Sequence, residues 1–173
     1  GVRYVKKHPA PFGEYIPYRS FFRKFSSKVD LVRTDFAPGG LSGALAMGPT
    51  TIGDVICFEV AYDGIVQQAV RDGARLLVVQ TNNATFGYTA ESVQQLAMSR
   101  LRAIETGRSV VHISTVGVSA VYGPDGAELA RSGHFTAEVL EATVPLRGGL
   151  TPAVRAGAVP EALLALLGLA VAA

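Results

Sequence analysis

The side chain with the clearest potential for chemistry is Cys57, the only cysteine of the 173-residue chain. It ends a mostly apolar run, Gly53–Cys57, and is followed at once by Phe58 and Glu59. A thiol at the end of a buried strand is well placed to act as a nucleophile at the rim of a sheet. A single cysteine cannot form an intrachain disulfide, so either packing or chemistry must explain it. A buried structural cysteine is the ordinary alternative.

A nucleophilic thiol needs a nearby cation or general base, because most free thiols are protonated at neutral pH. The candidates are Lys6, Lys7, His8, His112 and His134. Lys6 has the best support, since it precedes a proline-stiffened loop that can return Glu14 to its vicinity. A lysine there would favour the thiolate and stabilise a developing oxyanion. A surface ion pair is the alternative for Lys6 and Glu14, and a core position is the alternative for His112.

Hydrophobic patterning predicts an α/β domain that positions these side chains. Strands are expected at residues 51–58, 75–81, 109–115, 118–122, 127–130 and 138–144. Helices are expected at 63–72 and 90–106, and each is followed by a glycine that can end it. This alternation of strands and helices indicates helices packed on a mixed sheet.

The composition is that of a folded domain, with 49% hydrophobic and 17% charged residues. The net charge of +2 gives no general case for nucleic-acid binding. Residues 1–33 nevertheless hold eight basic side chains against two acidic ones. They form either a solvated basic face or a surface for anionic lipid headgroups, where each cation contributes about 1 kcal/mol. Neither metal-ligand spacing nor a nucleotide fingerprint is present, so no metal or cofactor is expected.

The two ends suggest a piece of a longer protein. The chain begins with Gly1, and residues 162–173 form an apolar run shorter than the roughly 20 residues of a membrane-spanning helix. We therefore expect a domain at 1–148 that lacks its N-terminal part. A linker and a truncated C-terminal transmembrane helix are expected at 149–173.

Two motifs resemble those of the nitrilase, or carbon–nitrogen hydrolase, superfamily. One is Lys6–Glu14, with the sequence KKHPAPFGE, and the other is Ile56–Glu59 around the cysteine. Within that superfamily the chain is similar to the apolipoprotein N-acyltransferases of bacterial membranes. Four further stretches in the same order support this branch, at residues 12–17, 81–87, 94–105 and 149–152.

The resemblance implies a nitrilase-like α-β-β-α sandwich, of which this chain supplies the C-terminal part. It also implies a Glu-Lys-Cys catalytic group. Cys57 would be the nucleophile, Lys6 would stabilise the oxyanion, Glu14 would orient the lysine, and Glu59 would support the site. The general base of this family is a glutamate upstream of the lysine, and we expect this chain to lack it and to be inactive alone.

Three residues are candidates for substrate binding. Phe58 stands where the family often has tyrosine, and it keeps the ring without the hydroxyl. Asn82 and Phe86 lie in the loop after the strand at 75–81, where Thr85 replaces a frequent tryptophan. Phe86 can supply the missing aromatic contact, or it can be an ordinary core or lid residue.

The leading hypothesis is an enzyme of the bacterial inner membrane, multi-pass, with its catalytic domain on the extracytoplasmic side. It would move a fatty acyl group from a phospholipid, through a thioester on Cys57, to the N-terminal cysteine amine of a lipoprotein. The alternative is a soluble nitrilase-type amidohydrolase or glutaminase domain that sends the acyl group to water. A third possibility is a non-catalytic domain that keeps the fold. The apolar end and the loop at 82–87 favour the first hypothesis.

Overall fold

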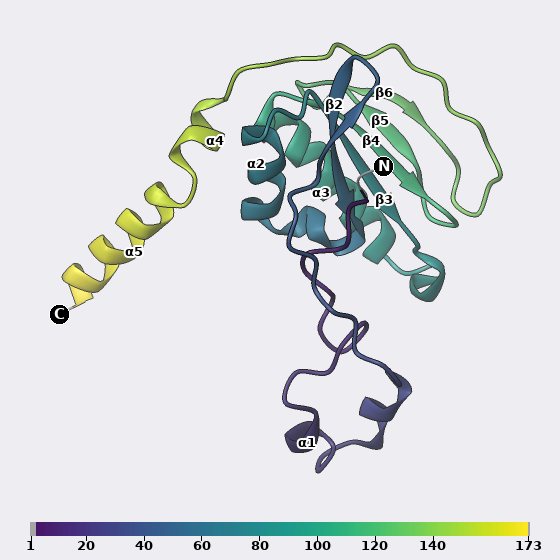
Figure 1. Ribbon diagram of the computed structural model, residues 1–173, viewed down its shortest axis with the longest axis vertical. Coiled ribbons are helices and arrows are strands. Elements are labelled where there is room, and N and C mark those ends of the chain that lie inside the picture. The colour runs from purple at the N-terminus through teal and green to yellow at the C-terminus, as the bar shows by residue number, and fades with distance from the viewer. Residues whose placement is uncertain (1–2, 173) are drawn as a thin grey trace.

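A mixed sheet organises the protein, whose computed structural model describes residues 3–172. Among those residues the sheet has six strands in the order β1-β2-β3-β4-β5-β6 (Figure 1). Their bounds are Ala44–Met47, Thr50–Ile56, Leu76–Thr81, Ser109–Ser114, Ala120–Tyr122 and Glu128–Arg131. The pairs β2–β3 and β3–β4 are parallel, and the outer pairs are antiparallel. The predicted α/β class with a mixed sheet is therefore confirmed.

Two helices connect the parallel strands and cover one face of the sheet. Helix α2 (Asp63–Arg71) joins β2 to β3, and α3 (Glu91–Thr106) joins β3 to β4. The core between helices and sheet is made of small and branched apolar side chains: Val55, Val66, Val70, Leu77, Val79, Leu96, Ala103 and Val110. Parallel neighbours need such crossover connections, and because β2, β3 and β4 are parallel their carboxyl ends meet at one edge.

The opposite face of the sheet is less covered. Side chains alternate along a strand, so Gln80 and Ile113 point away from the helices, and both are exposed. Residues 3–172 thus form one sheet with one helical layer, which is half of the expected α-β-β-α arrangement.

Two details of the strand prediction were wrong. No strand is expected at residues 44–47, but β1 forms there because Gly48 adopts a φ of 57° and turns the chain back to pair with β2. In the described chain the segment 138–144 is not a strand. It belongs to a long connection that arches over the sheet after β6 (Figure 1) and is held by bonds from Arg75 and Arg108 to main-chain oxygens.

An arm made of residues 10–37 projects from the domain (Figure 1). It carries α1 (Arg19–Phe22) and a short 3-10 helix, Ser27–Leu31, and Arg19 ties them together by donating to the carbonyl of Val29 at 2.9 Å. The two sides of its base are joined where Phe36 N donates to the Glu14 carbonyl at 2.9 Å.

The C-terminal segment leaves the domain through α4 (Pro152–Ala156) and α5 (Val159–Ala172). Thr151 caps α4 and donates to the carbonyl of Glu105 at 2.6 Å, which anchors this segment on α3. Helix α5 extends away from the rest of the chain with its leucines exposed (Figure 1). Its 14 residues are too short to cross a bilayer, and the same holds for every helix within residues 3–172. The expected transmembrane helix is therefore not confirmed.

Candidate active site

Cys57 lies on a strained turn at the carboxyl end of β2. It begins the 3-10 helix Cys57–Ala61, and its φ of 56° is in the left-handed region. A non-glycine residue in that region costs about 1–3 kcal/mol, and such strain is concentrated at functional sites. The turn leaves the thiol half-buried at the edge where the parallel strands end.

A cavity of about 610 Å³ opens at this edge. Its lining comes from the ends of β2, β3 and β4 and from the base of the arm: Glu14, Ile56, Cys57, Gln80, Thr81, Asn82, Ile113, Ser114 and Thr115. Asn82 is fixed there because its Oδ1 accepts a bond from Thr115 Oγ1 at 2.8 Å. The structure thus brings three of the sequence-predicted residues, Glu14, Cys57 and Asn82, to one cavity.

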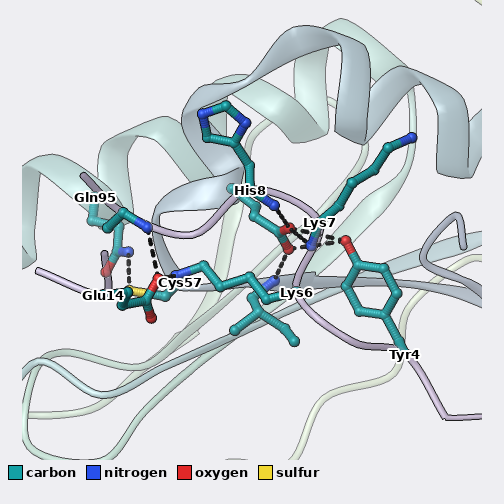
Figure 2. Close-up of polar contacts among 10 residues, drawn as sticks. Tyr4, Lys6, Lys7, His8, Glu14, Cys57 and Gln95 are labelled. Atoms are coloured by element: carbon teal, nitrogen blue, oxygen red, sulfur yellow. Dashed lines mark hydrogen bonds and ion pairs between the residues drawn. The ribbon is translucent and has the colours of Figure 1, made fainter. Parts of the chain in front are cut away.

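Lys6 reaches this cavity through Glu14. Its Nζ donates to Glu14 Oε2 at 2.6 Å, and Ala10 N donates to the same oxygen at 2.7 Å. The lysine side chain is only 10% exposed, so the pair is not the open surface ion pair considered above. Figure 2 shows the Lys6 side chain extended to Glu14 beside Cys57. The ion pair therefore holds a positive charge next to Glu14, one of the residues that line the Cys57 cavity.

Glu59 joins the lysine segment to the cysteine turn. Its carboxylate is fully buried and accepts bonds from the main-chain nitrogens of Lys7 (2.6 Å), His8 (3.0 Å) and Ile56 (2.9 Å). Tyr4 also donates its hydroxyl to both carboxylate oxygens at 3.0 Å, and Figure 2 shows Tyr4, Lys7 and His8 gathered around this group. Glu59 is not among the described residues that line the cavity. Its hydrogen bonds tie the main chain that follows Lys6 to the end of β2, directly before Cys57.

Tyr4 is a residue of the site that the sequence did not single out. Burial and the adjacent Glu59 carboxylate raise the pKa of its phenol well above the ordinary value. The phenol therefore stays protonated and remains a donor to Glu59 at all ordinary pH values. The only feature of the sequence that could have pointed to Tyr4 is its position two residues before the candidate lysine.

Phe58 and Phe86 line a second, smaller pocket of about 220 Å³. Its other lining residues belong to the start of α3: Glu91, Gln94, Gln95 and Met98. Gln95 connects this pocket to the nucleophile, since its Nε2 lies 3.6 Å from Cys57 Sγ. The two phenylalanines are therefore brought together close to the thiol, but in a pocket distinct from the cavity that holds Asn82.

The histidines of the described chain lie outside the lining of the Cys57 cavity. His112 is buried in β4, where its Nδ1 lies 2.8 Å from Ser99 Oγ, and burial lowers its pKa to about 4. It is thus a core histidine. His8 packs on Tyr62, and His134 stacks on Phe135. Within residues 3–172 there is also no group of three His, Cys, Asp or Glu side chains arranged to hold a metal ion.

The fold and the site define a class of protein: an α/β domain that presents a strained thiol beside a buried lysine–glutamate pair. Residues 2–149 match the family described as carbon–nitrogen hydrolase, and the chain belongs to that family. The carbon–nitrogen hydrolase from Helicobacter pylori G27 shares the fold, with a TM-score of 0.56 and 20% identity over 64% of this chain and 46% of that chain.

Individual relatives indicate which branch of this family the chain resembles. The chain is 42% identical over 171 residues to the apolipoprotein N-acyltransferase of Mycolicibacterium smegmatis, a match that covers 99% of this chain and 28% of the relative. It is 35% identical over 162 residues to the apolipoprotein N-acyltransferase of Ralstonia nicotianae, covering 91% of this chain and 31% of the relative. The similarity to apolipoprotein N-acyltransferases inferred from the motifs is confirmed. The chain spans less than a third of the length of these relatives.

Proposed function

We propose that this chain is the thiol-bearing part of an enzyme that transfers a fatty acyl group from a phospholipid to the N-terminal cysteine amine of a bacterial apolipoprotein. The observation that carries the proposal is the shared cavity of Cys57 and Glu14, with Lys6 bonded to Glu14 at 2.6 Å. The substrate class is taken from the apolipoprotein N-acyltransferases, one of which matches this chain over 99% of its length. Acyl transfer through a thioester needs a nucleophile and an oxyanion-stabilising cation; we assign the first to Cys57 and the second to Lys6, which is bonded to Glu14 at the lining of this cavity.

In the first step, the Cys57 thiolate attacks the ester carbonyl of the phospholipid. A C–S bond forms, the ester C–O bond breaks, and the lysophospholipid alkoxide leaves with a proton. Lys6 stabilises the oxyanion of the tetrahedral intermediate, and Glu14 holds the ammonium in place. The proton of the thiol goes to a glutamate outside these 173 residues, so we expect the chain alone to be inactive.

In the second step, the α-amine of the lipoprotein attacks the thioester carbonyl. A C–N bond forms, the C–S bond breaks and restores the thiolate, and the nitrogen gives up a proton to the same glutamate that acts as base in the first step. Phe58 and Phe86 offer an apolar pocket near the sulfur for the first methylenes of the acyl chain. Asn82 lines the cavity and offers its amide to the polar part of a substrate.

We also propose that the chain lies against the outer face of the bacterial inner membrane. The arm exposes Phe21 and Phe25, which are 53% and 73% accessible, beside Arg23 and Lys24. Aromatic and basic side chains together suit an anionic lipid interface. The leucines of α5 support the division into a catalytic domain at 1–148 and a membrane-associated segment at 149–173 of a multi-pass protein.

A soluble amidohydrolase or glutaminase domain is the second candidate, because the family that the chain matches is named for carbon–nitrogen hydrolysis. Intact protein should be incubated with a long-chain phospholipid or with a small amide, and the mass of the Cys57 peptide measured. A fatty acyl adduct that passes to a lipoprotein peptide supports the transferase. Ammonia release without acyl capture supports the hydrolase. Lipoprotein acylation that persists in Cys57→Ser rules out the assigned nucleophile and leaves a non-catalytic domain.

A further inference from the structure

Gln95 is a buried amide at the thiol, and the steps above give it no role. It comes from α3, its side chain is 3% exposed, and its Nε2 lies 3.6 Å from Cys57 Sγ. Figure 2 shows the amide nitrogen directed at the sulfur. At that distance an N–H can donate to a sulfur acceptor, which is larger and more diffuse than oxygen.

The other end of this amide is left without a partner. Gln95 Oε1 is buried and accepts no hydrogen bond from any described residue. A buried acceptor without a donor destabilises the folded state. A methionine of similar volume would fill the space without this penalty. Packing therefore does not account for an amide at this position, and its contact with the sulfur is what remains.

Gln67 shows what a structural buried glutamine looks like in the same chain. It is 6% exposed, its Nε2 donates to Glu105 Oε1 at 2.7 Å, and its Oε1 accepts from Arg71 at 3.1 Å. Both ends of that amide are satisfied within a network between α2 and α3. In Gln95 only the Nε2 end has a hydrogen-bond partner, and that partner is the sulfur of Cys57.

We propose that Gln95 is a catalytic residue that donates an N–H hydrogen bond to the Cys57 sulfur in its thiolate form. The inference rests on the proposed role of Cys57 as nucleophile. A donor stabilises an anionic acceptor more than a neutral one, so this contact favours the thiolate over the thiol. It acts again when the C–S bond of the thioester breaks, because the electron pair returns to a sulfur that already faces a donor. Gln95 thus serves both the formation of the nucleophile and its departure.

The test compares Gln95→Met with Gln67→Met in the intact protein. The pH dependence of iodoacetamide alkylation is followed at the Cys57 peptide by mass spectrometry, and the melting temperature is recorded. For Gln95→Met we expect the half-maximal pH to rise by about one unit, with an alkylation rate about tenfold lower near neutral pH. Its melting temperature should be equal or higher. Gln67→Met should show the reverse: a lower melting temperature and an unchanged pH profile.

A third variant, Gln95→Glu, places an acceptor against the sulfur and should shift the profile further upward. The proposal is overturned if Gln95→Met keeps the parent profile, or if Gln67→Met shifts the profile as much. Alkylation needs no acyl donor, so its outcome is separate from that of the acyl-transfer assay. If Cys57→Ser retained lipoprotein acylation, the proposed function would fail even with the Gln95 contact verified by alkylation.

Discussion

Replacing Glu59 by glutamine tests whether one buried carboxylate holds the lysine and the cysteine in register. The best amide orientation keeps an oxygen at Oε1 for the nitrogens of Lys7 and His8 and places the NH₂ at Oε2, facing the Ile56 N–H. One hydrogen bond to a charged acceptor is then lost, at about 1.5–3 kcal/mol, and the remaining ones become neutral bonds of about 0.5–1.5 kcal/mol each. Removing a buried charge offsets part of this loss. We expect Glu59→Gln to lower the free energy of unfolding by about 2–4 kcal/mol.

The effect on chemistry should exceed the effect on folding. At a temperature where the variant is still folded, a displacement of about 1 Å between the lysine and the thiol would slow thioester formation on the order of 100-fold. The measurements are urea unfolding and the rate of acyl capture at Cys57, the latter in the intact protein. The matched control is Glu128→Gln, which removes an exposed ion pair with Arg131 and should change stability by less than about 1 kcal/mol. Unchanged stability together with an unchanged rate in Glu59→Gln would refute the positioning role.

Three further predictions concern the core, the turn and the arm. Burial lowers the pKa of His112 to about 4, so the unfolded state binds more protons than the folded state between pH 6.5 and 4. The free energy of unfolding should therefore fall by up to about 3 kcal/mol as pH drops through that range. A His112→Asn variant should lose this slope in pH-dependent unfolding. Cys57→Gly should be about 1 kcal/mol more stable than Cys57→Ala in thermal unfolding, because glycine accepts the φ of 56° without strain, while equal stability would argue against a strained turn. The double variant Phe21→Ser/Phe25→Ser should bind anionic vesicles more than tenfold more weakly in a sedimentation assay. The control Tyr88→Ser alters an exposed aromatic side chain outside the arm and should leave vesicle binding unchanged.

The sequence was a good guide to the local parts of this site. Apolar periodicity predicted β2, β3, β4 and the two helices between them, because each is long and has a consistent buried face. The motifs also selected residue types that the structure places at one edge of the sheet, Cys57, Glu14 and Asn82. The strand and helix predictions depend on neighbours in sequence, whereas the resemblance to the nitrilase superfamily selected the site residues.

Contacts between distant residues could not be predicted in the same way. The bonds from Tyr4 and Lys7 to Glu59 join positions 55 and 52 residues apart. The contact of Gln95 with Cys57 spans 38 residues and depends on how α3 settles on the sheet. On the sequence alone, Lys6 and Glu14 could equally have been an exposed pair, and only burial of the lysine separates the two interpretations. Strand β1 was missed because its pairing depends on a turn at Gly48 rather than on its own pattern.

Three features near the sulfur depart from what stability alone would favour. Cys57 has a backbone conformation suited to glycine, Glu59 is a fully buried carboxylate, and Gln95 has an unpartnered carbonyl among the described residues. A single substitution at each of these positions, of a kind that protein cores tolerate, would remove the unfavourable feature. Local rules are usually broken where function requires it, and here the three departures lie on or beside the turn that carries the thiol. This grouping around the turn supports the proposal that Cys57 acts as a nucleophile.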